Sequence, residues 1–345
     1  MPDLPIFFPD IIMVPGGFML ILHSPMDMHV HLRQGDMLAL VAPHTARDFA
    51  AAVVMPNLTP PVTSLAQVLD YRQEILRVTG ESFTPFMTLF FRAYSREELL
   101  AARPHIIGLK LYPAGMTTNS EDGLADMRQA NATLAIMEEL GIPLLIHGEG
   151  CGFVMDREAA FLPVVREWAG AFPRLRIVLE HVTTEAGVKL LDRFENLFAT
   201  ITLHHLFITL DDVLGGLMRP HLFCKPVAKR PEDRDALRRA ALDHPQAFFG
   251  SDTAPHPVTA KEAPGCAAGI FSAPVALPAL AGLFEELDAL DRLQAFVSDR
   301  ACAAYGLTPM ARDVRLERSA WTVPQSIGCV VPYLAGQSLD WRVVD

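Results

Sequence analysis

Several side chains able to bind a metal ion follow apolar runs of this sequence. His29 and His31 belong to MDMHVHL, His147 follows IPLLI, His181 follows IVLE and Asp252 follows AFFGS. Side chains two positions apart in a strand lie on one face, so His29 and His31 are able to share one ion. Each residue taken singly also fits a hydrogen-bonded core position. Together, the imidazoles and the carboxylate are ligands that Zn²⁺ favours, and they predict a zinc site.

Lys110 is an unusual residue because it lies in a run, GLKLY, that is otherwise apolar. A lysine at the end of a buried strand is costly unless it is paired, modified or able to extend its amine to water. Reaction of the amine with CO2 turns the cation into a carbamate, whose two oxygens can bridge two metal ions. An unmodified ammonium between two dications would be repelled. We therefore expect an N6-carboxylated Lys110 that bridges two zinc ions.

These side chains are far apart in sequence and need a scaffold that brings them together. Eight apolar or alternating runs are strand candidates, at residues 26–32, 51–56, 83–91, 106–112, 142–148, 176–182, 197–205 and 247–252. Helical spacing characterises the stretches between them, at residues 64–78, 95–103, 126–140, 156–170, 184–194 and 232–244. Several of these stretches open on Ser, Thr or Asp, which are common N-cap residues.

Apolar strands that alternate with helices predict a parallel sheet buried on both faces. Eight such units fit a TIM (β/α)8 barrel, with a doubly wound sheet as the alternative. The predicted ligands all lie at the carboxyl ends of their strands. In a barrel those ends meet on the face that carries active sites, which explains how residues 29 and 252 come together.

Composition and charge exclude several classes of protein. The 345 residues are 50% hydrophobic and 20% charged, which is typical of a globular chain and excludes intrinsic disorder. The net charge of -11 and the lack of a basic run argue against a nucleic-acid partner. No apolar stretch is long enough to predict a membrane span. We divide the chain into an N-terminal extension, residues 1–25, and a catalytic barrel with a C-terminal extension, residues 26–345.

The cysteines and the N-terminus indicate a cytoplasmic protein. The five cysteines form no CxxC pair, which favours free thiols in a reducing compartment over a disulfide framework. The apolar N-terminus lacks the positive segment of a signal peptide, because the first Lys or Arg is Arg33.

Eight motifs together resemble the dihydroorotases of the amidohydrolase superfamily. They are DMHVHLRQGDML, VVMPNLTPPVT, GLKLYPAGMTTNS, IPLLIHGE, VLEHVTT, RPHLFCKPVAKR, GSDTAPH and KEAPGCAAGIFSAP, in that order. The resemblance extends over residues of about 26 to 335 and is greatest to the short bacterial type, which is a homodimer. The chain departs from the family pattern in its N-terminal extension and at Lys225, a position that varies within the family.

The resemblance implies roles for individual residues. His29, His31 and Asp252 are similar to the ligands of one zinc ion, His147 and His181 to those of the other, and carboxylated Lys110 to the bridge that acts together with a hydroxide. The remaining implied site residues bind the substrate. These are a clamp for its α-carboxylate (Arg33, Asn57 and His256), backbone around Ala268 and Cys224, and the tip of a mobile loop (Thr117 and Thr118).

The expected chemistry is a zinc-dependent cyclic amide hydrolysis. Two adjacent metal ions acidify a shared water and polarise the amide carbonyl that it attacks. Asp252 is expected to serve as general base and then as general acid. The implied reaction is the reversible cyclisation of N-carbamoyl-L-aspartate to L-dihydroorotate in pyrimidine biosynthesis. Arg33 is expected to attract this anionic substrate despite the negative net charge.

Two other functions remain open. A hydantoinase or allantoinase would keep the metals and lose the carboxylate clamp, against which Arg33, Asn57 and His256 argue. An inactive dihydroorotase-like scaffold for aspartate transcarbamoylase would lack metal ligands, and every ligand type is present here. His204 and His205 end the seventh run, and we expect them to be structural.

Overall fold

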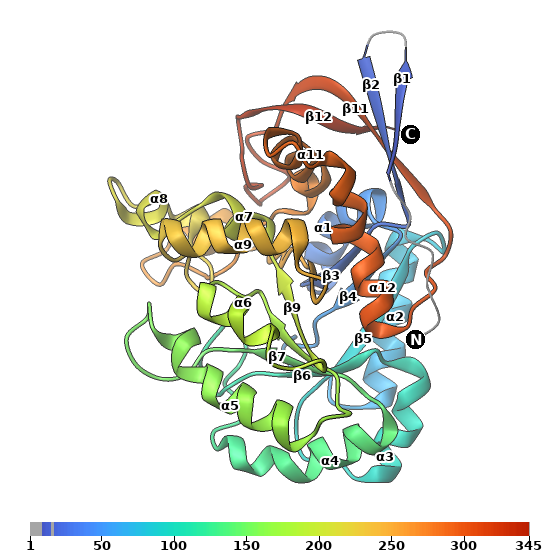
Figure 1. The fold of residues 1–345 in the computed structure, drawn as a ribbon, viewed down its shortest axis with the longest axis vertical. Helices are drawn as coiled ribbons and strands as arrows, with labels where there is room; N and C mark the ends of the chain where they lie inside the picture. The colour runs from blue at the N-terminus through green and yellow to red at the C-terminus, as the bar shows by residue number, and fades with distance from the viewer. Residues whose placement is uncertain (1–8, 15–16, 345) are drawn as a thin grey trace.

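Eight parallel strands form a nearly closed barrel in the computed structural model, which describes residues 9–14 and 17–344 (Figure 1). They follow one another around the barrel in chain order. Their bounds are β3 Met26–Val30, β4 Ala51–Val54, β5 Thr84–Phe90, β6 Gly108–Leu111, β7 Leu144–His147, β8 Ile177–Glu180, β9 Leu197–Ile201 and β10 Ala247–Phe249. All eight lie within the predicted runs, and the prediction of a TIM barrel is confirmed.

The barrel closes where its first and last strands meet, at their carboxyl ends. Val30 forms a parallel bridge with Thr253, and the Asp252 amide donates to the His29 carbonyl at 2.9 Å. Gly250 permits this approach: a Cβ atom there would lie 2.9 Å from the Thr200 Cβ and 3.0 Å from the His29 Cβ. Closure therefore brings the first predicted ligands beside the last.

Helices surround the barrel (Figure 1). They are α1 Gly35–Asp48, α2 Leu65–Thr79, α3 Arg96–Ala102, α4 Asn131–Leu140, α5 Arg157–Ala171, α6 Glu185–Leu191, α7 Leu203–Phe207, α8 Leu210–Leu214, α9 Pro231–Asp243, α10 Val258–Lys261, α11 Ala276–Glu286 and α12 Arg300–Tyr305. The predicted N-caps Ser64, Ser95 and Thr184 each accept a hydrogen bond from a first-turn backbone amide. The predicted strand 197–205 is too long, because β9 ends at Ile201 and α7 contains both His204 and His205.

A second, antiparallel sheet packs beside the barrel and joins the two ends of the chain. Its order is β1 Asp10–Val14, β2 Gly17–His23, β11 Asp313–Thr322 and β12 Ser338–Val344. Residues 19–23, which belong to the predicted N-terminal extension, thus pair with the C-terminal strand β11, and β1 pairs with β2 at the edge of the sheet. The first residues of that extension, 1–8, lie outside the described part of the chain.

The core has two main parts. Most buried apolar side chains lie between the barrel and its helices. A smaller cluster combines residues of β3, β4, β7, β8 and β10, including Met28, Val53, Leu145, Val178 and Phe248, and it fills the barrel interior. In the part of the chain that the structure describes, no helix has the length and apolar character needed to cross a bilayer.

Candidate active site

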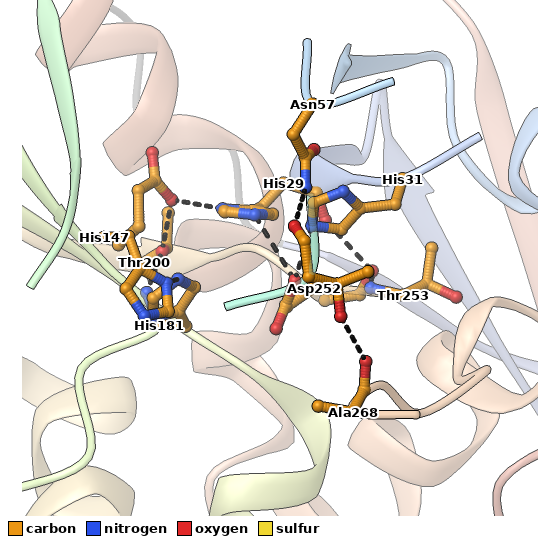
Figure 2. Close-up of polar contacts among 12 residues, drawn as sticks. His29, His31, Asn57, His147, His181, Thr200, Asp252, Thr253 and Ala268 are labelled. Carbon is orange, nitrogen blue, oxygen red and sulfur yellow. Dashed lines mark hydrogen bonds and ion pairs between the residues drawn. The ribbon is translucent and has the colours of Figure 1, made fainter. Parts of the chain in front are cut away.

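His29, His31 and Asp252 form a buried group at the carboxyl end of the barrel. The Asp252 Oδ1 atom lies 3.3 Å from His29 Nε2 and 3.0 Å from His31 Nε2 (Figure 2). Burial raises the pKa of Asp252, but the hydrogen bond from His31 and the electrostatic influence of His29, His31 and Lys110 outweigh it and bring the pKa to about 2. Burial and the Lys110 charge hold the pKa of His29 well below its usual range. Neutral imidazoles around a carboxylate suit a cation.

His147 and His181 form the neighbouring pair. His147 Nδ1 lies 3.1 Å from His181 Nε2, and the His181 ring centre is 5.2 Å from that of His29. Burial, with the His147 and Lys110 charges, holds the pKa of His181 well below its usual range. The four predicted histidines are therefore brought into one site (Figure 2).

Lys110 ends inside the protein rather than at its surface. Its side chain is fully buried, and its Nζ atom lies 5.1 Å from the centre of the Tyr112 ring. Burial lowers the pKa of Lys110 to about 8, although the Glu180 and Asp252 charges oppose the shift. Among the described residues, neither Lys110 Nζ nor the buried His181 Nδ1 has a hydrogen-bond partner. Buried polar atoms are rarely left in this state, so the site fits a metal ion and a modified amine.

Two buried glutamates orient the histidines, and the sequence analysis did not identify either one. His29 Nδ1 donates to Glu180 at 2.7 Å, which leaves Nε2 free to bind an ion. His147 Nε2 donates to Glu149 at 2.9 Å in the same manner. Carboxylates behind ligating histidines fix the tautomer and the ring orientation. The sequence signal that could have identified them is their position next to the predicted ligands, in HGE and LEH.

The predicted carboxylate clamp lies on one side of this cluster. Arg33 Nε donates to the Pro255 carbonyl at 3.1 Å, and its Nη2 atom lies 3.2 Å from His256 Nε2. The same His256 nitrogen is 3.0 Å from the Ala268 carbonyl. Arg33 and Ala268 line the pocket that contains the histidines, together with Tyr112, which the sequence analysis also missed.

The loop at Thr117 and Thr118 forms part of the pocket wall. Both threonines line the pocket, and Thr118 Oγ1 donates to the Ala268 carbonyl at 3.4 Å. Asn57 Nδ2 donates to the Thr118 carbonyl at 3.1 Å, and Asn119 donates back to the Asn57 carbonyl at 3.1 Å. In this structure Asn57 therefore holds the loop rather than projecting freely into the pocket.

Cys224 lies apart from the pocket, whereas the adjacent Lys225 lines it. The Cys224 side chain instead faces a separate apolar cavity. Its sulfur, with His204 and His205, forms a second group whose ligand atoms lie within 4.8 Å of one another. His205 already uses both ring nitrogens, with Thr202 and the Pro226 carbonyl. We therefore assign no ion to this group.

Three site residues have left-handed backbone conformations. The φ angles are 62° at Arg33, 43° at His181 and 47° at Asp252. Such angles are uncommon for residues other than glycine and concentrate at functional sites. Each residue follows the end of a barrel strand, where the turn directs its side chain over the barrel mouth.

Comparison with known proteins identifies close relatives of this chain. The pattern of the amidohydrolase family matches residues 12–309. A dihydroorotase of Helicobacter hepaticus is 48% identical, over 93% of this chain and 97% of its own. The crystal structure of a dihydroorotase from Campylobacter jejuni has a TM-score of 0.91 at 49% identity and covers 95% of this chain and 98% of its own. A Saccharomyces cerevisiae dihydroorotase, solved with 5-fluoroorotic acid, has a TM-score of 0.89 at 36% identity and covers 94% and 98%.

Proposed function

The chain belongs to the dihydroorotases of the amidohydrolase family, and on this premise we propose that it interconverts N-carbamoyl-L-aspartate and L-dihydroorotate as a step of pyrimidine biosynthesis. One observation carries the proposal: the Arg33 side chain lines the same pocket as the cluster of histidines and Asp252. The substrate that fits this pocket is a cyclic amide with a carboxylate: the amide would lie at the hydrolytic centre and the carboxylate at the cation. The yeast relative, solved with a carboxylated pyrimidine, supports the same ligand class.

The pocket residues provide two zinc sites in this proposal. His29, His31 and Asp252 would hold one ion, His147 and His181 the other, and a carboxylated Lys110 would bridge them. When bound, the ions acidify water and polarise the amide carbonyl. The buried, unpartnered Lys110 amine supports the carboxylation, because its lowered pKa makes the reactive neutral form more accessible.

Asp252 moves the proton. The Asp252 carboxylate is ionised at neutral pH, and its Oδ1 or Oδ2 atom would accept a proton from the attacking water. The same carboxyl then donates this proton to the amide nitrogen as the ring opens. In the direction of ring closure, Asp252 takes a proton from the ureido nitrogen. His31, 3.0 Å from Oδ1, holds the carboxylate in position.

Arg33 binds and orients the substrate carboxylate. Its hydrogen bond to the Pro255 carbonyl and its contact with His256 position the guanidinium at the pocket wall. A guanidinium grips a carboxylate through two parallel hydrogen bonds, which fixes orientation as well as affinity. Thr117 and Thr118 cover the pocket and exclude water while the ring is bound.

An assay of both reaction directions tests the function. We expect ring opening of L-dihydroorotate and ring closure of N-carbamoyl-L-aspartate, both lost with a strong chelator and restored by Zn²⁺. Metal analysis should give two zinc ions per chain. Hydantoin, which lacks the carboxylate, is the control substrate. Turnover of hydantoin but not of dihydroorotate would instead assign another cyclic amidase.

We also propose that the enzyme is a homodimer in the cytoplasm. The resemblance to short bacterial dihydroorotases supports the dimer. Five free cysteines, of which Cys151 and Cys329 are exposed, support a reducing compartment. Light scattering on the purified enzyme and fractionation of cells measure the two properties.

A further inference from the structure

Lys261, the last residue of α10, is a second buried lysine near the pocket. Only 3% of it is exposed. Its Nζ atom donates to the carbonyls of Phe223, Ala267 and Gly269, each at 2.8 Å. An ammonium has three N–H donors, and three carbonyls accept them. The described residues provide no carboxylate within ion-pair distance of this ammonium.

The three carbonyls belong to two segments that build one wall of the pocket. Phe223 precedes Lys225, and Ala267 and Gly269 flank Ala268. Lys225, Ala268 and Gly269 line the pocket. The Gly269 amide also donates to the Phe223 carbonyl at 3.0 Å, so the two segments contact each other directly where Lys261 binds both.

The carbonyls alternate in direction along the second segment. Those of Ala267 and Gly269 accept from Lys261, whereas that of Ala268 lies 3.0 Å from His256 Nε2 and accepts from Thr118 Oγ1 at 3.4 Å. Fixing the two outer carbonyls therefore fixes the middle peptide unit, which faces the pocket.

An ammonium buried without a carboxylate costs more free energy than an apolar side chain of the same length. An apolar side chain at this position would pack against the barrel equally well. Only the ordering of the two loop segments needs a donor that binds carbonyls of both. A methionine would fill the same volume and would leave the carbonyls of both segments without their shared donor.

We propose that Lys261 is a positioning residue for the substrate-binding wall, which it holds through the carbonyls of Phe223, Ala267 and Gly269. It touches no reacting atom. Its ammonium sets the relative position of the 223–225 and 267–269 segments, so that their backbone groups meet the ring of the bound substrate. This inference rests on the proposed function only for the identity of that substrate.

Hydrogen exchange tests the positioning without any assay of activity. In Lys261→Met, the backbone amides of residues 223–225 and 266–270 should exchange faster than in the wild type. The matched control is Arg300→Met. Arg300 is a half-buried cation that likewise binds backbone carbonyls, those of Ala241, Leu242 and Ala247 at the opposite end of the barrel. Its loss should affect exchange there and leave the pocket wall unchanged.

Kinetics supply the functional measurement. For Lys261→Met we expect the KM for dihydroorotate to rise about tenfold, the loss of roughly one hydrogen bond, with kcat within about threefold of the wild type. Arg300→Met should keep the wild-type KM even where it lowers the melting temperature. Zinc content should be unchanged in both variants.

The outcomes separate this inference from the proposed function. Exchange at the pocket wall and a KM that match those of Arg300→Met would overturn the role of Lys261. If Lys261→Met does not fold, Lys261→Leu, which also has no donor, takes its place in the exchange experiment, and unchanged exchange would again overturn the role. A wild-type enzyme without ring-opening activity would refute the function, and the exchange result would still decide the positioning.

Discussion

Replacing Glu180 by glutamine tests whether the glutamates behind the histidines tune metal binding. Glu180 Oε2 accepts hydrogen bonds from His29 Nδ1 and from Thr200 Oγ1, both at 2.7 Å. The glutamine amide has the same shape and can still accept from His29 through its oxygen. The substitution therefore removes the negative charge and leaves the packing of the buried site intact.

The magnitude follows from the bond that is lost. A hydrogen bond to a charged group contributes about 1.5 to 3 kcal/mol, compared with about 1 kcal/mol for a neutral pair. Loss of such a partner behind a ligating histidine typically weakens metal binding ~10- to 100-fold. We expect zinc affinity to fall within this range at the site that includes His29, because the Nε2 atom of His29 becomes a weaker metal ligand.

The assay is a titration of the metal-free enzyme with Zn²⁺ in competition with a chelator of known affinity. The matched control is Glu158→Gln. Glu158 is equally buried and accepts from the backbone and hydroxyl groups of Thr183 and Thr184, outside the histidine cluster. The Glu158→Gln substitution should lower the free energy of unfolding without changing zinc affinity. Equal zinc affinities for Glu180→Gln and the wild type would refute the reasoning.

Three further substitutions give distinct results. Lys110→Ala should abolish nearly all activity, with partial rescue by short carboxylic acids in the assay; full activity would contradict the carbamate bridge. Arg33→Met should raise the KM for dihydroorotate at least tenfold through loss of a charged hydrogen bond, and steady-state kinetics with an unchanged KM would remove Arg33 from the clamp. Phe249→Ala should lower the free energy of unfolding by about 3 to 5 kcal/mol, since Phe249 is fully buried and stacks on Phe49. A loss under 1 kcal/mol in denaturant titration would show that the site repacks.

Local sequence pattern predicted the barrel because each unit carries its own signal. The strands are short apolar runs, and helices α2, α3 and α6 open on Ser64, Ser95 and Thr184. The proposed ligands His29, His31, His147, His181 and Asp252 were recognisable as candidates because a parallel barrel places all carboxyl strand ends on one face. Helix α1, which contains Pro43, was not predicted.

Contacts between segments that are distant in sequence could not be predicted, because no local sequence pattern encodes them. Strands β2 and β11 pair although about 290 residues separate His23 from Asp313, and neither run reveals its partner. Likewise, no local pattern shows that Lys261 binds the carbonyl of Phe223, because that bond depends on how two loops meet.

The sequence by itself thus determined the fold class and which residues have ligand chemistry. Only the tertiary structure decided how they are held: the tautomer set by Glu180, the left-handed turn at Asp252 and the burial that lowers the pKa of Lys110. The physical reason is the separation in sequence of the groups that interact. Strand and helix periodicity arises between residues a few positions apart, whereas burial, charge and hydrogen-bond partners arise from groups that only the closed barrel brings together.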